Sequence, residues 1–355
     1  MKKHSRIWVG AAFCIALFST GLCSAADSKS EPINLKAECV GHYQLDLPDR
    51  IEIATRFPPS MHSHRDEDRL DPFRFSDGVR AYFSHGFNVT DKMSEDEFSA
   101  LTSQIIQGRE KVRQSMPKEA AGDYHQYDLG VPQSFAWRSQ VGIVVALYRG
   151  GRVFYQGFTG DLGSKDYPAE FEKQVALDRQ YAASFQLREP FVIPATAGQC
   201  IPYGFVPDDG KAPRDIAVTV RPVDHPEVLI TLEEKSIIGP DPRLPNMGSL
   251  AFMLQYDYGP ASPKMKQLDQ HKQQIAGRAG EMVFVRLYRK TGQEDYVYLA
   301  SVFGSSKAPT DTPTITLRIE RNSALTKNTP ISEKDFKKLA ERIAASIQRR
   351  PVTQP

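Results

Sequence analysis

The chain has 355 residues, of which 40% are hydrophobic and 25% are charged, a composition typical of a soluble globular protein. This composition excludes collagen-like, coiled-coil and largely disordered chains, and the length predicts two domains. The 45 basic and 43 acidic residues nearly cancel, which excludes a nucleic-acid-binding protein that relies on a strongly positive field.

The first 26 residues predict a secretory signal peptide. Basic residues open the segment, an uncharged run follows over residues 7–18, and small residues precede Asp27. This run is shorter than a retained membrane anchor requires. We therefore expect cleavage after Ala26, a periplasmic protein, and no stable insertion in the membrane. Acylation of Cys23 is the alternative, but the preceding Leu22 is bulky where such sites carry a small residue.

Cleavage would leave Cys39 and Cys200 as the cysteines of the mature chain. Two thiols in an oxidising compartment have a single connectivity, so they form either one disulfide or two separately buried free thiols. Cleavage also removes basic residues but no acidic ones, which turns the small net positive charge into a small net negative charge.

A charged segment follows two prolines at residues 58–59. Its ligand-type side chains are His62, His64, Asp66, Glu67 and Asp68. In an extended segment, alternation would place both histidines, Asp66 and Asp68 on one side, as in a metal site. Arginines interrupt the cluster, so we expect a solvated loop that contacts a partner, and no metal or cofactor.

The first half predicts helices and antiparallel strands. Ser94 and Glu97 form a capping-box pattern at a helix start, Gly150 and Gly151 suit a hairpin turn, and Pro168 suits the first turn of a helix. The expected elements are a helix over residues 95–113, strands over 136–148 and 153–158, and a helix over 168–185.

The second half repeats much of this order. Asp208, Asp209 and Gly210 predict a turn, and Ser332 with Asp335 predicts the start of the last helix. The expected elements are strands over 216–220 and 228–232, a polar helix over 265–274, strands over 282–288, 296–302 and 315–319, and a helix over 333–347.

Two pairs of segments repeat at nearly the same offset. Ala182–Pro190 resembles Ala344–Pro351 at an offset of 162, and Cys39–Tyr43 resembles Cys200–Phe205 at an offset of 161. Such self-similarity predicts a duplicated unit. We expect an α+β fold of two similar units, each a mainly antiparallel sheet packed with helices. The expected domains are residues 27–190 and 199–355, joined by a semi-rigid linker over 191–198.

Common catalytic signatures are absent from the sequence. It contains no Gly-x-Ser-x-Gly, His-Glu-x-x-His, Gly-x-x-x-x-Gly-Lys or Cys-x-x-Cys motif. Several common enzyme classes therefore lose their strongest sequence signature, although a catalytic triad can also be assembled from distant positions. Two alternatives are a periplasmic hydrolase that uses His62 or His64 as its base, and an envelope module that binds a small ligand between its units.

Several short segments carry a family resemblance. They are Glu38–Tyr43, Asp46–Pro48, Gln199–Phe205, Ala276–Glu281 and Ser346–Pro351. In their order and spacing they resemble the two-domain periplasmic immunity proteins that neutralise lipase effectors of type VI secretion systems. His42 departs from the arginine expected beside the tyrosine of the first motif.

The resemblance implies an inhibitor rather than an enzyme, which binds one cognate phospholipase-type toxin in a one-to-one complex. The two domains would grip the toxin and block lid opening or substrate access. Loops that differ between the two halves are expected to contact the toxin, because a repeat preserves its framework for packing. These loops are residues 62–69 and the loop that contains Asp241, Arg243 and Asn246.

Overall fold

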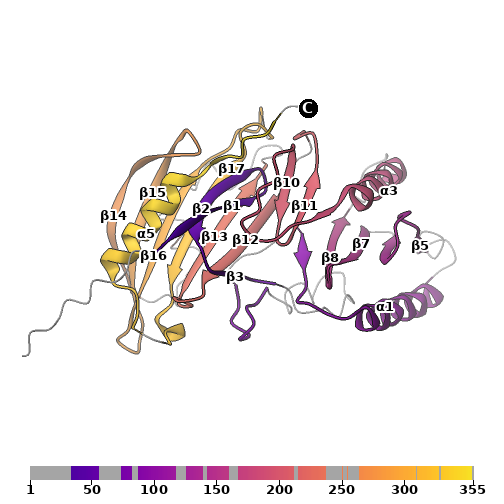
Figure 1. Cartoon of the computed structure of the whole chain (residues 1–355), viewed down its shortest axis with the longest axis horizontal. Coiled ribbons are helices and arrows are strands. Elements are labelled where there is room, and N and C mark those ends of the chain that lie inside the picture. Colours follow the sequence, from indigo (N-terminus) through magenta and orange to yellow (C-terminus); the bar gives the residue numbers. More distant parts are fainter. Residues whose placement is uncertain are drawn as a thin grey trace, which may run out of the picture. The chain divides into compact units, whose positions relative to one another are not determined.

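The fold consists mainly of antiparallel sheets with helices packed on them (Figure 1). The computed structural model describes residues 33–55, 73–81, 87–116, 125–138, 142–159, 167–211, 215–236, 250, 254, 264–308, 310–327 and 329–353. The expected α+β class is confirmed. The residues of the predicted signal peptide lie outside the described residues.

A five-stranded sheet forms most of the first half, in the order β4-β8-β7-β6-β5. Its strands are β4 (Asn88–Val89), β5 (His125–Tyr127), β6 (Ser134–Arg138), β7 (Gly142–Arg149) and β8 (Arg152–Thr159). The predicted hairpin is confirmed as β7 and β8, and the turn residues Gly150 and Gly151 have φ of 58° and 76°. Left-handed backbone at both central positions is the geometry that joins two strands tightly. The segment expected as one strand over residues 136–148 contains parts of β6 and β7.

Two helices cover opposite faces of this sheet. Phe98 and Ile105 of α1 (Glu95–Ser115) pack in one cluster with Ala146 and Tyr148 of β7. Val145 of β7 points to the other face, where it lines a cavity with residues of α3 (Tyr167–Ser184). The predicted capping box of α1 is confirmed, since Ser94 and Glu97 exchange backbone-to-side-chain hydrogen bonds of 2.6 and 3.2 Å.

A seven-stranded sheet forms most of the second half, in the order β14-β15-β16-β17-β13-β12-β3. Its strands are β3 (Ile51–Ile53), β12 (Asp215–Pro222), β13 (Val228–Lys235), β14 (Lys264–Ile275), β15 (Arg278–Tyr288), β16 (Glu294–Val302) and β17 (Thr314–Arg321). The last helix, α5 (Glu333–Ser346), begins at Ser332 as predicted, and its Phe336 ring packs against Phe284 and Tyr296 at 6.0 and 5.9 Å.

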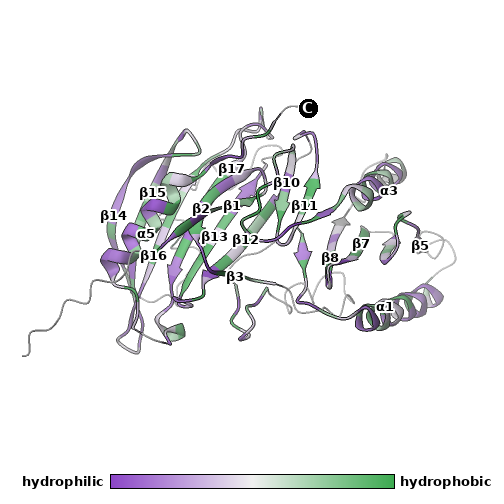
Figure 2. Cartoon of the chain, viewed as in Figure 1, coloured by the Kyte–Doolittle hydropathy of each residue, from purple (hydrophilic) through white to green (hydrophobic). Residues whose placement is uncertain are grey.

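Residues 265–274 form a strand, so the helix predicted there is wrong. They lie in β14, which pairs with β15 from Lys264 to Ile275. Figure 2 shows β14 as largely hydrophilic, and most of its side chains are exposed. Its lysines and glutamines favour helices, but a helix without an apolar face gains nothing from packing. The ladder with the buried β15 decides the structure, and charged side chains are usual on an edge strand.

Short strands at the end of each half pair with the hairpin of the other half. The first hairpin is β1 (Leu35–Val40) and β2 (Tyr43–Pro48), and β18 (Gln348–Arg349) from the chain end pairs with β2. The second hairpin is β10 (Gly198–Ile201) and β11 (Gly204–Pro207), and β9 (Gln186–Leu187) pairs with β11. In addition, β3 pairs with β12. We call this arrangement the strand exchange.

Glu227 ties the start of α5 to the seven-stranded sheet. Its carboxylate accepts a hydrogen bond of 3.1 Å from the Ile331 backbone and contacts His225 Nδ1 at 3.2 Å. Its backbone oxygen accepts from Asn322, which begins the short 3-10 helix η1 (Ser323–Leu325). The hydrogen bond to Glu227 raises the pKa of His225. Burial alone would raise the pKa of Glu227, but the hydrogen bonds from His225 and from the backbone outweigh this effect, so the pKa of Glu227 is lowered.

We expect His225→Gln to destabilise the protein at mildly acidic pH and not at alkaline pH. A group whose pKa is raised by folding stabilises the protein fully at a pH below its pKa in the unfolded chain, which is 6.5 for His225. This stabilisation disappears as the pH rises through the pKa of the group in the folded protein. The expected loss is about 0.5 kcal/mol for such a partly exposed pair, measured by urea unfolding across this pH range. In a Glu227→Gln background the pH dependence of the substitution should disappear; if it persists, another group titrates.

Candidate functional site

Residues from both halves meet around the two hairpins, in a region that we call the junction. It contains Cys39, His42, Arg188, residues 189–200 and Arg350. A disulfide joins Cys39 to Cys200, with Cα atoms 5.7 Å apart. Beside it, the backbones of Gly41 and Cys200 exchange two hydrogen bonds of 2.8 Å each. The junction therefore connects the two hairpins both covalently and through backbone pairing.

Arg188 is the first of two buried arginines in the junction. Its guanidinium forms an ion pair of 2.6 Å with Glu38, and both side chains are at most 4% exposed. It also donates to the carbonyl oxygens of Gly204 and Cys39 at 3.1 and 3.2 Å. Glu38 in turn accepts from the backbone of Phe191 at 2.5 Å. One ion pair thus holds β1, the second hairpin and the linker together.

Arg350 occupies the corresponding place at the end of the second half. Its guanidinium donates to the carbonyl oxygens of Thr196 and Gly198 at 2.8 and 2.6 Å, and also to that of Pro194. Burial lowers the pKa of Arg350. The backbone of Arg350 donates to His42, and the backbone of Arg188 donates to Tyr203. Each arginine therefore follows a strand that pairs with the opposite hairpin.

His42 connects the first hairpin to the seven-stranded sheet. Its Nδ1 lies 2.9 Å from Glu234 Oε1, its Nε2 lies 3.4 Å from Asp208 Oδ1, and its backbone donates to Glu234 Oε2 at 2.8 Å. His42 and Glu234 are 8% and 2% exposed. Because both ring nitrogens face carboxylates in a buried site, this histidine is poorly placed to activate a hydroxyl group or water for catalysis. It acts as a structural contact.

We expect Gly41→Ala to lower the free energy of unfolding by about 3 kcal/mol. Gly41 has φ of 58°, and a Cβ atom there would lie 2.0 Å from Glu234 Oε2. The substitution would therefore strain the turn and displace the carboxylate that binds His42. Urea unfolding would measure the loss.

Gly292→Ala is the matched control, because Gly292 also has positive φ but has open space around its Cβ direction. It should lower the free energy of unfolding by about 1 kcal/mol from backbone strain alone. Equal losses in the two variants would show that the contact with Glu234 is unimportant.

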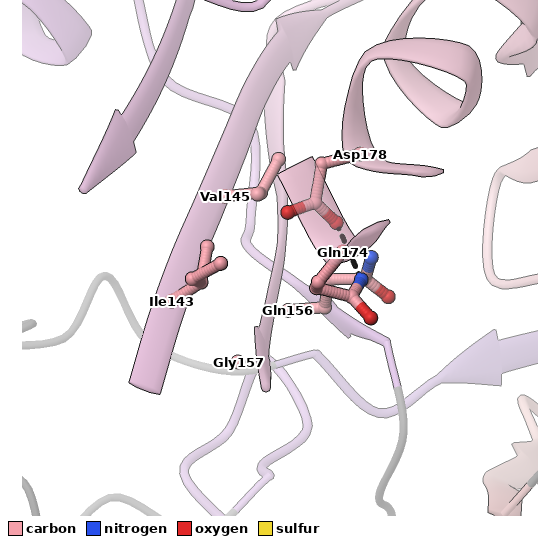
Figure 3. Close-up of a pocket in the computed structure, with 6 residues that line it drawn as sticks. All are labelled: Ile143, Val145, Gln156, Gly157, Gln174 and Asp178. Atoms are coloured by element: carbon pink, nitrogen blue, oxygen red, sulfur yellow. Dashed lines mark hydrogen bonds between the residues drawn. The ribbon is translucent and has the colours of Figure 1, made fainter. Parts of the chain in front are cut away.

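A second polar site lies within the first half, between α3 and the β7-β8 hairpin. A cavity of about 110 Å³ is lined by Ile143, Val145, Gln156, Gly157, Gln174 and Asp178 (Figure 3). Asp178 accepts hydrogen bonds of 2.8 Å from Tyr127 and from Gln174. Burial raises the pKa of Asp178. A buried carboxyl group in a cavity is a candidate site for binding.

The structure tests only part of the site predicted from the sequence. It brings Cys39 and Cys200 together in the junction. The predicted contact residues of both loops lie outside the described residues: His62, His64, Asp66, Glu67, Asp68, Asp241, Arg243 and Asn246. Within the described part of the chain, no group of histidine, cysteine and acidic side chains is arranged to hold a metal ion. The helices in that part are too short or too polar to cross a membrane.

Sequence reasoning missed the arginines and acids that form these sites. Arg188 and Arg350 belong to the repeated segments, so the repeat marked them without showing that they are buried. Asp178 lies on the same side of its helix as Val175 and Tyr181, and an acid at an apolar position was a signal for a special site. Glu234 had no local signal, because its partner His42 is 192 residues away.

The comparisons with known proteins identify the class of this fold. Residues 192–352 match the family model described as "Tle cognate immunity protein 4 C-terminal domain". This part of the chain is therefore similar to that family of immunity proteins, and the resemblance inferred from the motifs is confirmed. No curated protein sequence matches the chain significantly.

Solved structures of immunity proteins share the fold over nearly the whole chain. The chain is similar to the apo structure of immunity protein TplEi of a type VI secretion system from Pseudomonas aeruginosa, with 17% identity and a TM-score of 0.59, covering 90% of this chain and 98% of that one. It is also similar to a chain in the crystal structure of the Tle4-Tli4 complex, with 17% identity and a TM-score of 0.60, covering 91% and 100%. At this identity, the likeness establishes the fold.

Proposed function

We propose that this chain is a periplasmic immunity protein that binds and inhibits a cognate lipase toxin of a type VI secretion system. The observation that carries the proposal is the match of residues 192–352 to a family of immunity proteins. The fold shared with immunity proteins over 90% of the chain supports it. The role is inhibition by binding rather than catalysis, and the buried, carboxylate-bound His42 is consistent with that role.

Two similar units grip the toxin in this proposal. They comprise residues 27–190 and 199–355, are joined by residues 191–198, and arose by duplication. The equivalent contacts of Arg188 and Arg350 and the strand exchange support this division. A junction that is covalently closed and held by buried hydrogen bonds keeps the units preorganised, which reduces the entropy lost when the toxin binds.

The contacts with the toxin are assigned to loops that the repeat does not preserve. We place them at residues 62–69 and around Asp241, Arg243 and Asn246, where the halves differ. In the complex, these loops block lid opening or substrate access to the lipase. A cleaved signal peptide at residues 1–26 delivers the protein to the periplasm, where the disulfide is stable.

Co-expression tests the proposed function directly. Residues 27–355 are produced with the lipase-like protein encoded nearest to the gene, and the pair is separated by size-exclusion chromatography. We expect one co-eluting peak of one-to-one composition in which phospholipase activity is suppressed. Separate elution with full lipase activity, repeated with the other lipase effectors of the same genome, would refute the proposal.

A further inference from the structure

The cavity beside Asp178 is lined by apolar side chains of β7 and by polar side chains of α3 and β8. Figure 3 shows Gln174 and Asp178 of α3 facing Val145 and Gln156 of the sheet. Ile143 and Val145 are each 1% exposed and form the apolar wall. The cavity is partly open at the surface, where Gly157 is exposed. Its volume of about 110 Å³ is enough for the end of one long side chain.

The partners that the described residues offer to the carboxyl group of Asp178 are all neutral. Asp178 is 1% exposed, and its hydrogen-bond donors are Tyr127, Gln174 and Gln156. Among the described residues, no lysine, arginine or histidine forms an ion pair with it. A carboxylate has about four acceptor positions, so this one can accept further donors. Burial of an acid without a cation disfavours its charged form, which is why its pKa is raised.

The corresponding positions of the second half are apolar and filled. At the offset of 162 residues, Gln174 and Asp178 of α3 correspond to Phe336 and Ala340 of α5. Both of these are 0% exposed, so the space under α5 is packed. Polar side chains at the same positions in α3 lower the stability of the fold, and such residues usually mark a functional site. Leu177 differs in the same way, since it is 47% exposed whereas Leu339 is 3% exposed.

We propose that this cavity is a socket for one lysine or arginine side chain of the toxin, and that Asp178 binds its cationic group. That this side chain comes from the toxin rests on the proposed function. The walls formed by Ile143 and Val145 suit the methylene groups of such a side chain, and the carboxylate with the side-chain oxygens of the two glutamines suits its donors.

Free ethylguanidinium tests the cavity without the toxin. Amide chemical shifts of residues 27–355 are followed by NMR during titration with this cation. We expect saturable shifts around Gly157 and Gln174 in the wild type and their loss in Asp178→Asn. Glu172→Gln, an exposed acid on the same helix, should retain the shifts.

Affinity for the cognate lipase tests the source of the cation. We expect Asp178→Asn to weaken the complex by about tenfold or more, and Glu172→Gln to leave it within about twofold. Unchanged affinity in Asp178→Asn, or unchanged ethylguanidinium shifts in that variant, would overturn the proposal. If the wild type binds ethylguanidinium in the cavity but binds no lipase, the proposed function is refuted, and so is the toxin as the source of the bound side chain. The cavity would then still be a cation site.

Discussion

Replacing both Cys39 and Cys200 by serine is expected to lower the free energy of unfolding by about 4 kcal/mol. The disulfide closes a loop of 161 residues, and a cross-link over so long a loop removes a large part of the conformational freedom of the unfolded chain. In the folded chain, the hydrogen bonds between Gly41 and Cys200 would still connect the hairpins, so we expect a folded but less stable protein.

Chemical unfolding of residues 27–355 measures this loss. The wild type in the presence of dithiothreitol should approach the stability of the double serine variant, and the variant itself should be insensitive to the reductant. If reduction leaves the stability of the wild type unchanged while its thiols become titratable, the disulfide contributes nothing to stability.

Arg188→Met is expected to lower the free energy of unfolding by about 4 kcal/mol, because it leaves a buried carboxylate without its cation. Glu38 would keep its hydrogen bonds to the backbone of Cys39 and Phe191, but its charge would lose its ion-pair partner, Arg188. The carbonyl oxygens of Gly204 and Cys39 would also lose a donor. The measurement is again urea unfolding.

An exposed ion pair supplies the matched control for Arg188. Arg50 Nη1 lies 3.1 Å from Asp224 Oδ1, but the two side chains are 64% and 66% exposed. Arg50→Met should therefore lower the free energy of unfolding by less than about 1 kcal/mol. Adding Glu38→Gln to Arg188→Met should recover part of the loss, since the uncompensated charge is removed. Similar losses in Arg188→Met and Arg50→Met would show that burial of the ion pair is unimportant.

Local sequence signals predicted the elements well where they were strong. The cap at Ser94, the turn at Gly150 and Gly151 and the cap at Ser332 all lie where the structure has them, because each signal acts within a few residues. The strand β14 was predicted as a helix, since its polar composition reflects an exposed edge and the sheet partner that decides its structure could not be inferred locally.

The contacts that define the candidate sites depend on long-range pairing. The side chain of Ser346 accepts a hydrogen bond from the backbone of Asp46, which is 300 residues away, and no local pattern indicates such a partner. Among the sequence signals, the repeat offset gave the best indication of these contacts, because it aligned Arg188 with Arg350 and Cys39 with Cys200. It could not show that each half completes the sheet of the other, since pairing partners are not encoded by periodicity.

The strand exchange also sets an order of events during synthesis. The N-terminal residues leave the ribosome first, yet β2 receives its outer strand, β18, only when the last residues of the chain have been made. Until then β2 has an unpaired edge, the kind of surface that associates with other chains. Removal of the last residues would therefore leave this edge of β2 without its partner strand.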